Sequence, residues 1–337
     1  MVYVMEKNDL GKKGLAIKKN CDVIADTREI THDQWLEKRK NGVGGSDVAA
    51  ILGLSSWTSE VELWLDKRGE ADEVGEIDKR DNSEVLEWGT ILEPVIRKKY
   101  AAMHPSEKVF TVPFMLRNKK NPCMLADLDG LVFSNGEWSI LEIKTCAAFK
   151  AGVWGTDDEP EIPVYYQTQA MHYMTVTGIH RVRFAVLIGG NHYIERTFFY
   201  DEEFGETLTG IENAFWHKVK DGIRPEIDGS EASTKYVNRF KGGDEGALVI
   251  DDLAEVLEKL GEAIVNVKAA EEEKAKCENI IKEAMGDHNT ATCNGIQITW
   301  KPQSKKMVDA AKLKKDFPEV YAQCEKISYS RPFKPKF

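Results

Sequence analysis

The stretch from Met124 to Cys146 constrains the fold more than any other part of this sequence. It consists of two runs of apolar and β-branched residues on either side of Ser134-Asn135-Gly136-Glu137. Asn-Gly is the strongest short-range signal for a two-residue type I′ turn, because both central residues of that turn need a positive φ. The stretch therefore predicts a β-hairpin with a fixed register.

That register predicts where the charged residues of the hairpin lie. With the Asn-Gly pair as the loop, Asp129 is placed opposite Glu142, and Asp127 is placed opposite Lys144. Side chains directly opposed across two strands lie about 5 Å apart, and like charges so placed destabilise a sheet. A bound divalent cation would compensate for the repulsion between Asp129 and Glu142.

Glu142 and Lys144 share one face of the second strand, because side chains alternate with a period of two. Two carboxylates and an ammonium therefore converge on one patch of the sheet. Magnesium prefers oxygen ligands and keeps several waters, so Asp129 and Glu142 suffice to hold it beside a phosphate. A nearby lysine can then position or help to deprotonate an attacking water. An isolated match of this kind also fits a surface hairpin with ordinary cross-strand ion pairs.

The order Asp129, then Glu142-Ile143-Lys144, resembles the signature of the PD-(D/E)XK nuclease superfamily. Three further segments make the chain similar to the YqaJ-type phage recombination nucleases, which are relatives of phage lambda exonuclease. These segments are Gly42-Val43-Gly44-Gly45-Ser46-Asp47, Trp88-Gly89-Thr90-Ile91-Leu92-Glu93-Pro94 and Tyr166-Gln167-Thr168-Gln169. The similarity extends over roughly residues 35 to 225.

The resemblance implies an α/β fold, a PD-(D/E)XK restriction-endonuclease-like core with a mixed β-sheet flanked by helices. A smaller C-terminal domain with helices and a hairpin follows, because residues 249–285 carry an apolar stripe at helical spacing and Asn294-Gly295 predicts a second hairpin. We expect a mobile N-terminal arm at 1–20, the nuclease domain at 21–225, a linker at 226–246, and the long helix, hairpin and basic end at 247–337.

The resemblance also implies magnesium-dependent hydrolysis of DNA phosphodiester bonds. Asp129, Glu142 and the backbone carbonyl of Ile143 would bind Mg²⁺, for which Mn²⁺ would substitute, and Lys144 would position the water. Glu93 matches a family acidic residue near the metal and is a further candidate metal ligand.

Gln167 matches a family glutamine that contacts the water or the scissile phosphate. On its own it also fits a half-buried packing amide. Glu93 likewise has a second interpretation, because Thr90 and Glu93 have capping-box spacing, with Pro94 in the first turn of a helix.

In the resembled family an arginine and a serine seven residues apart hold the terminal 5′-phosphate of DNA, and Arg39 and Ser46 have that separation. Gly42, Gly44 and Gly45 interrupt the preceding helix. A helix N-terminus after such a turn presents free N–H groups that suit a phosphate oxygen. Taken alone, Ser46 also fits a helix cap and Arg39 a surface ion pair.

The activity implied by the family is a 5′-to-3′ exonuclease that leaves 3′ overhangs on linear duplex DNA for a phage-type single-strand annealing protein. The family also implies a homo-oligomeric ring, trimeric or tetrameric, around the DNA. An endonuclease on the same fold is one alternative, and a catalytically silent DNA-binding or assembly protein is another. The three residues Asp129, Glu142 and Lys144 disfavour the silent protein, because binding alone gives no reason to oppose two carboxylates.

The net charge of −10 opposes a nucleic-acid partner at first sight, since phosphate binding needs Lys and Arg. However, residues 201–300 hold 22 Asp and Glu against 11 Lys and Arg, whereas residues 301–337 hold 10 Lys and Arg against 4 Asp and Glu. An acidic middle and a basic end allow a positive path across the site.

The sequence also bears on where the protein works. The six cysteines lack metal-ligand spacing, and the sequence has neither a membrane-length apolar run nor a secretion signal. We therefore expect a cytoplasmic protein with reduced thiols and no membrane partner, encoded by a bacterium or a prophage.

Overall fold

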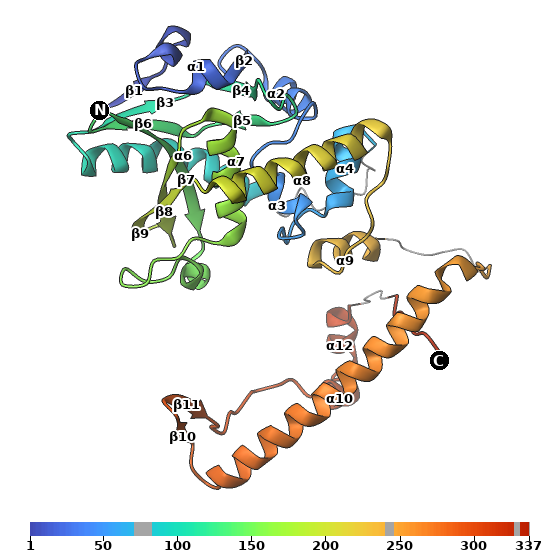
Figure 1. Cartoon of the computed structure of the whole chain (residues 1–337). Coiled ribbons are helices and arrows are strands. Elements are labelled where there is room, and N and C mark those ends of the chain that lie inside the picture. The colour runs from blue at the N-terminus through green and yellow to red at the C-terminus, as the bar shows by residue number, and fades with distance from the viewer. Residues whose placement is uncertain (71–82, 240–245, 327–330, 337) are drawn as a thin grey trace. The chain divides into compact units, whose positions relative to one another are not determined.

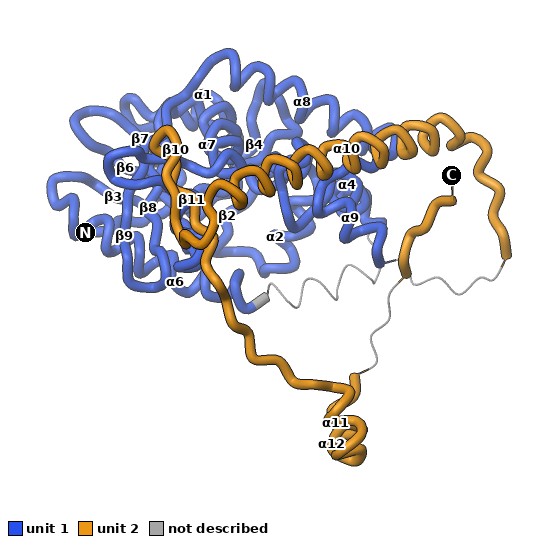
Figure 2. Tube along the Cα trace, turned by 90° about the horizontal axis from the view of Figure 1, so that it is seen from below, with its two compact units in different colours: residues 1–240 blue, residues 241–337 orange. Residues whose placement is uncertain are grey.

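The computed structural model describes residues 1–70, 83–239, 246–326 and 331–336. The chain forms two compact units, residues 1–240 and residues 241–337, which Figure 2 distinguishes by colour. Unit 2 is the smaller C-terminal domain expected from the sequence.

Unit 1 is built on a six-stranded mixed sheet with the strand order β1-β3-β6-β7-β8-β9 (Figure 1). The β1–β3 and β7–β8 pairs are parallel, and the other pairs are antiparallel. Its strands are β1 (Val2–Val4), β3 (Lys108–Thr111), β6 (Gly130–Ser134), β7 (Glu137–Cys146), β8 (Arg181–Ile188) and β9 (His192–Phe199). A three-stranded antiparallel sheet contains β2 (Cys21–Asp26), β4 (Phe114–Asn118) and β5 (Leu125–Asp127).

Helices flank the six-stranded sheet, which confirms the α/β class with a mixed sheet. The helices of unit 1 are α1 (Ile17–Asn20), α2 (His32–Arg39), α3 (Val48–Ile51), α4 (Glu60–Arg68), α6 (Ser83–Met103), α7 (Val164–Thr177), α8 (Glu202–Asp221) and α9 (Glu231–Asn238). Two 3₁₀ helices span Lys7–Gly11 and Ala148–Trp154.

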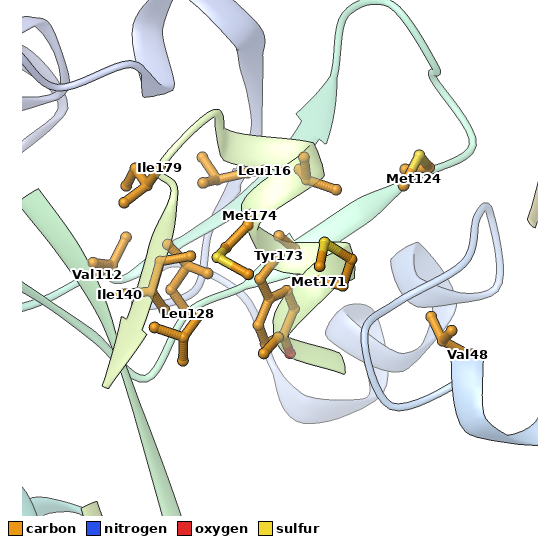
Figure 3. Packing of buried hydrophobic residues seen from close by; sticks show 14 of the residues in the cluster. Val48, Val112, Leu116, Met124, Leu128, Ile140, Met171, Tyr173, Met174 and Ile179 are labelled. Atoms are coloured by element: carbon orange, nitrogen blue, oxygen red, sulfur yellow. The ribbon is translucent and has the colours of Figure 1, made fainter. Parts of the chain in front are cut away.

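Alternation along β7 divides the core into two clusters. Leu141 and Ile143 pack with Ile96 and Tyr100 of α6, whereas Ile140 belongs to the cluster that contains α7. Figure 3 shows the second cluster, in which residues of α7 gather with others from the two sheets. Labelled members of this cluster are Met171, Met174, Leu128, Ile140 and Leu116. Glu142, which alternates with Leu141 and Ile143, therefore lies on the α7 side of β7.

Residues 1–20 do not form the expected mobile arm. β1 extends the six-stranded sheet by pairing in parallel with β3. Met5, Leu10 and Ile17 are buried in the main core. The prediction was wrong because these apolar residues follow no helical or strand period, and each is stabilised by contacts with distant parts of the chain.

The expected linker at 226–246 is also wrong in its first part. α9 lies within it, begins with the Ser230 hydroxyl accepting a hydrogen bond from the amide of Ser233, and buries Ala232. Unit 1 therefore extends beyond the predicted boundary at residue 225, to residue 240. Residues 240–245 of the expected linker lie outside the described residues.

Unit 2 contains the long helix and the hairpin predicted from the sequence. Asn294 and Gly295 have φ values of 48° and 79°, as a type I′ turn requires. Its elements are a 3₁₀ turn (Asp251–Leu253), α10 (Ala254–Met285), β10 (Thr290–Cys293), β11 (Ile296–Thr299), α11 (Ala310–Asp316) and α12 (Pro318–Cys324). Within the described ranges, every helix is too short or too polar to cross a membrane.

A buried ion pair holds α7 in position. His172 of α7 and Glu212 of α8 are both 0% exposed, and His172 Nδ1 lies 2.8 Å from Glu212 Oε2. His172 Nε2 lies 2.7 Å from the carbonyl oxygen of Leu125 in β5. Burial opposes the charged imidazolium, but Glu212 and the Leu125 carbonyl together raise the pKa of His172. The imidazolium therefore ties α7 to both α8 and β5.

Glu212→Gln is expected to lower the free energy of unfolding by about 3 kcal/mol at acidic to neutral pH, because it leaves a buried imidazolium without its counter-charge. The folded-state pKa of His172 is raised, so the pair stabilises fully below the unfolded-state pKa and loses this contribution as pH rises through the folded-state value. Urea denaturation over a pH series measures the difference.

Glu37→Gln is the matched control for this prediction. It removes a solvent-exposed ion pair with Lys40, in which the Glu37 side chain is 72% exposed, and should change the unfolding free energy by less than about 1 kcal/mol. A Glu212→Gln protein as stable as the unaltered chain at every pH would show that the buried pair does not stabilise unit 1.

Candidate active site

The hairpin of β6 and β7 has the predicted turn and register. Asn135 and Gly136 have φ values of 51° and 84°, and the ladder pairs Gly130 with Leu141. Because only a residue that tolerates positive φ fits either turn position, the Asn-Gly pair alone sets which residues of the two strands face each other.

Asp129 lies immediately before the first paired residue of β6, at the end of the ladder. Its Oδ2 atom accepts a hydrogen bond of 2.7 Å from the backbone amide of Ile143. This bond holds the carboxylate beside Glu142, the neighbour of Ile143 in β7. The sequence prediction that Asp129 and Glu142 come together is confirmed.

Asp127 does not lie opposite Lys144, contrary to the predicted register. It pairs instead with Met115 in the three-stranded sheet. The chain leaves that sheet after Asp127 and joins the six-stranded sheet at Gly130. A hairpin register holds only while both strands stay in one sheet, so it could not extend to Asp127.

Glu142 and Lys144 form a buried ion pair on β7. Glu142 is 1% exposed, so it lies deeper than a residue on an open active face. Lys144 Nζ lies 2.7 Å from Glu142 Oε1, whereas Glu142 Oε2 is buried with no hydrogen-bond partner among the described residues. Burial and the charge of Asp129 raise the pKa of Glu142 to about 8. Burial opposes the charge of Lys144, yet Glu142, Tyr166 and Asp129 raise its pKa.

Glu93 joins this group from α6. It forms an ion pair with Arg97 one turn later, and Arg97 Nη2 donates a 2.8 Å hydrogen bond to the backbone carbonyl of Asp129. Burial and the negative charge of Asp129 raise the pKa of Glu93. Burial also raises the pKa of Asp129, and burial together with the charge of Asp129 raises that of Glu142.

The alternative capping-box interpretation of Glu93 is wrong. α6 runs from Ser83 to Met103 with Pro94 inside it, so Thr90 stands in the middle of a helix. The Thr90 hydroxyl donates a 3.2 Å hydrogen bond to the carbonyl of Leu86, one turn earlier. Glu93 therefore lies in the middle of α6, where its ion pair with Arg97 fixes its side chain.

Gln169, which the sequence analysis did not single out as a site residue, contacts Lys144. Gln169 Oε1 accepts a 3.0 Å hydrogen bond from Lys144 Nζ, and Gln169 Nε2 donates a 3.2 Å bond to the Tyr173 hydroxyl. Gln167 Nε2 donates instead to the carbonyl of Ile162 at 2.7 Å. The missed signal was the four-residue spacing of Gln169 and Tyr173, which places both side chains on one helix face.

The structure brings the candidate phosphate-binding residues Arg39 and Ser46 into contact. Arg39 Nη2 donates a 2.7 Å hydrogen bond to Ser46 Oγ and lies 3.2 Å from Asp47 Oδ1. Its guanidinium carbon lies 4.9 Å from the Trp35 ring centroid. Lys67 Nζ lies 2.6 Å from Asp47 Oδ2, a contact that the sequence did not indicate. Two cations therefore share one carboxylate beside the exposed Ser46 hydroxyl.

Gly45 brings this second group close to α7. A Cβ at this position would lie 2.6 Å from the ring of Tyr173 and 3.0 Å from Gln169 Cγ, so a larger residue would push the loop away. The loop that carries Ser46 therefore packs directly on the two side chains that support Lys144.

The three carboxyl side chains of Glu93, Asp129 and Glu142 suit a hard divalent cation. Where the structure describes the chain, it holds no cluster of three or more His, Cys, Asp and Glu side chains arranged for a metal. Magnesium requires only one or two carboxylates, with a carbonyl and waters completing its shell. Glu142 Oε2 has no hydrogen-bond partner among the described residues, and the pKa values of Glu93, Asp129 and Glu142 are all raised. Both observations indicate that a cation would stabilise these carboxylates.

Comparison with known proteins identifies relatives over most of the chain. The YqaJ-like viral recombinase domain family matches residues 34–180. The "Uncharacterized protein YqaJ" of Bacillus subtilis (strain 168) is 33% identical over 321 residues, which cover 94% of this chain and 97% of that protein.

Solved structures are similar at a lower level. The alkaline exonuclease LHK-Exo from Laribacter hongkongensis has a TM-score of 0.43 and 20% identity, over 57% of this chain and 94% of that chain. Its complex with dAMP has a TM-score of 0.43 and 20% identity, over 61% of this chain and 96% of that chain.

The raised pKa of Glu142 predicts how the metal-free protein responds to pH. In EDTA, thermal stability should fall as pH rises from about 4.5, the ordinary value of the carboxyl group, to about 8, because the folded state keeps a proton that the unfolded state has lost. Glu142→Gln should weaken this fall and raise the melting temperature at pH 8. Adding Mg²⁺ should stabilise the unaltered protein more than the variant.

Glu107→Gln is a control of opposite sign. Burial opposes the charge of Glu107, but Arg183 at 2.8 Å lowers its pKa, so the substitution should destabilise the protein at pH 8. If Glu142→Gln were less stable than the unaltered chain in EDTA at pH 8, the inference that the buried carboxyls destabilise the metal-free protein would be wrong.

Proposed function

Since the chain belongs to the YqaJ-like viral recombinase family, we propose that it is a magnesium-dependent deoxyribonuclease. The observation that carries this proposal is the meeting of Asp129, Glu142 and Lys144 at the end of one hairpin. A binding protein gains nothing from two buried carboxylates that repel each other. A phosphodiesterase gains a place for a cation and, beside it, a positive group for the phosphate.

Asp129, Glu142 and the carbonyl of Ile143 would hold the Mg²⁺ ion, with Glu93 as a further ligand. Mn²⁺ should substitute, because it also accepts carboxylate and carbonyl oxygens. The ion would supply stabilisation of negative charge on the attacking and leaving oxygens.

The remaining residues would orient the reactants. Lys144 has a raised pKa and is therefore protonated, so it donates hydrogen bonds to the water or to the phosphate and is not itself the base. Gln169 Oε1 accepts a hydrogen bond from Lys144, and Gln169 Nε2 donates one to the Tyr173 hydroxyl. We therefore propose that Gln169 positions Lys144, and that Gln167 has the role at the water or scissile phosphate that the family resemblance implies.

We further propose that the chain is a 5′-to-3′ exonuclease, on the basis of Arg39 and Ser46. Arg39 and Lys67 both bind Asp47, so two cations lie beside the Ser46 hydroxyl. A guanidinium and an adjacent hydroxyl suit a terminal 5′-phosphate. Digestion from that end leaves a 3′ overhang for a single-strand annealing protein. Action as a homo-oligomeric ring in the bacterial cytoplasm completes the proposal.

The central test compares end-labelled linear duplex with closed circular duplex, each with Mg²⁺ or EDTA. Linear DNA should be digested only with Mg²⁺, and circular DNA should resist. Lys144→Ala should slow digestion at least about 100-fold, because it removes a positioned donor at the reacting phosphate.

Lys98→Ala, which changes an exposed lysine on α6, should cut like the unaltered protein. Circular dichroism checks that both variants fold. Normal digestion by a folded Lys144→Ala protein would refute the nuclease assignment, and rapid cutting of circles would identify an endonuclease.

Arg39→Ala should slow digestion of 5′-phosphorylated duplex about tenfold and reduce its advantage over 5′-hydroxyl duplex, because charge-assisted hydrogen bonds to the phosphate are lost. Arg39→Lys keeps the positive charge but loses the bidentate hydrogen bonds, so its rate should lie between those of the unaltered protein and Arg39→Ala. Arg28→Ala removes a surface arginine paired with Asp26 and is the control. The measurement is the ratio of the two rates, and an unchanged ratio in Arg39→Ala would exclude Arg39 from recognition of the end.

A further inference from the structure

A row of aromatic rings leads away from the candidate active site. Lys144 Nζ lies 4.7 Å from the centroid of the Tyr166 ring. Tyr165 packs edge-on against Tyr166, with 4.4 Å between ring centroids, and Trp57 packs edge-on against Tyr165 at 6.1 Å. The row therefore begins at a residue of the proposed catalytic group.

The row continues to side chains that solvent reaches. Lys150 Nζ lies 5.7 Å from the ring centroid of Trp57 and 6.0 Å from that of Phe149. Trp57 is 51% exposed and Phe149 is 86% exposed, while Tyr165 is half-buried. Exposed aromatic side chains that lie next to one another indicate a binding site, whereas single exposed apolar residues are common on any protein surface.

Ordered backbone presents the outer rings of the row. The Ser55 hydroxyl accepts hydrogen bonds from the amides of Trp57 at 3.2 Å and Thr58 at 3.1 Å. Lys235 Nζ donates a 3.1 Å hydrogen bond to the carbonyl of Ser56. Trp57 is thus exposed by a turn whose polar groups are satisfied, and its exposure does not result from a loose chain.

The inner end of the row rests on the core. Tyr166 stacks on Trp154, with 5.5 Å between ring centroids and 26° between ring planes. Trp154 is 1% exposed. The row therefore has a fixed base, and a ligand that stacks on it orders few additional side chains.

We propose that Trp57, Phe149, Lys150, Tyr165 and Tyr166, named here the aromatic row, bind the bases of single-stranded DNA beside the cleavage site. This inference rests on the proposed nuclease function, because a strand cut next to Lys144 has to leave or enter along a surface that continues from it. Nucleobases stack on aromatic side chains whatever their sequence, and each stack contributes to affinity.

The charge of the row favours DNA over an apolar protein segment. Lys150 lies between two rings, and no carboxylate in the described part of the chain lies within ion-pair distance of it. Its ammonium is therefore available to a phosphate that links two stacked bases. An apolar peptide would leave that ammonium desolvated without a counter-charge.

The test measures binding of a fluorescently labelled single-stranded oligothymidylate by anisotropy in EDTA, where no cleavage takes place. Trp57→Ala and Phe149→Ala should each weaken binding about tenfold, because each removes one stacking surface. Trp57→Phe should keep most of the affinity. An abasic oligonucleotide of equal length and charge should bind the unaltered protein and the variants alike.

Phe199→Ala is the matched control, because Phe199 is an exposed aromatic residue that does not belong to the aromatic row. It is 61% exposed and pairs with Arg181 at the end of β9. It should leave binding of the oligonucleotide unchanged. Unchanged affinity in Trp57→Ala and Phe149→Ala would overturn the proposal. An equal loss for normal and abasic strands would also overturn it, since the loss would then not come from base stacking.

The two proposals fail in different ways. If the protein digests linear duplex but both alanine variants bind the oligonucleotide normally, the aromatic row is refuted and the nuclease stands. If both variants lose stacking but neither the unaltered protein nor Lys98→Ala cuts DNA, the nuclease is refuted and the base-binding surface stands.

Discussion

The candidate site of unit 1 is organised around one unfavourable contact, the burial of Asp129 beside Glu142. Burial raises the pKa of both carboxyls, and the charge of Asp129 raises that of Glu142 further. Lys144 and Arg97 oppose this only in part. The surrounding elements hold the contact in place: the amide of Ile143 binds Asp129, and Arg97 of α6 binds its carbonyl. Such strain is tolerated where a ligand relieves it, which is why the contact indicates chemistry more strongly than any single motif.

α7 links that contact to the rest of the unit. Its inner face carries His172, which forms the buried pair with Glu212, and its neighbouring positions carry Gln169 and Tyr173, which support Lys144. Its first turns carry Tyr165, an inner ring of the aromatic row. Stability, orientation of the reactive lysine and the surface beside it therefore depend on the position of one helix.

Prediction succeeded for residues whose positions follow from local backbone geometry. The turn at Asn135 and Gly136 sets the register, and strand alternation puts Glu142 and Lys144 on one side of β7. Prediction missed the contact of Gln169 with Lys144, because helical spacing does not specify which face of α7 meets β7. It also failed for Met5 and its neighbours in residues 1–20, whose burial depends on strands more than 100 residues away along the chain.

Local sequence specified the hairpin, the register next to its turn, and the separate C-terminal helix with its own Asn-Gly turn. These follow from backbone preferences and periodicity, which act between residues close in the chain. Only the tertiary structure decided that Asp127 belongs to another sheet, that Gln169 reaches Lys144, and that Lys67 shares Asp47 with Arg39. Each of those contacts joins residues on different helices or strands. Their packing depends on the shape and burial of the whole unit, which no local pattern contains.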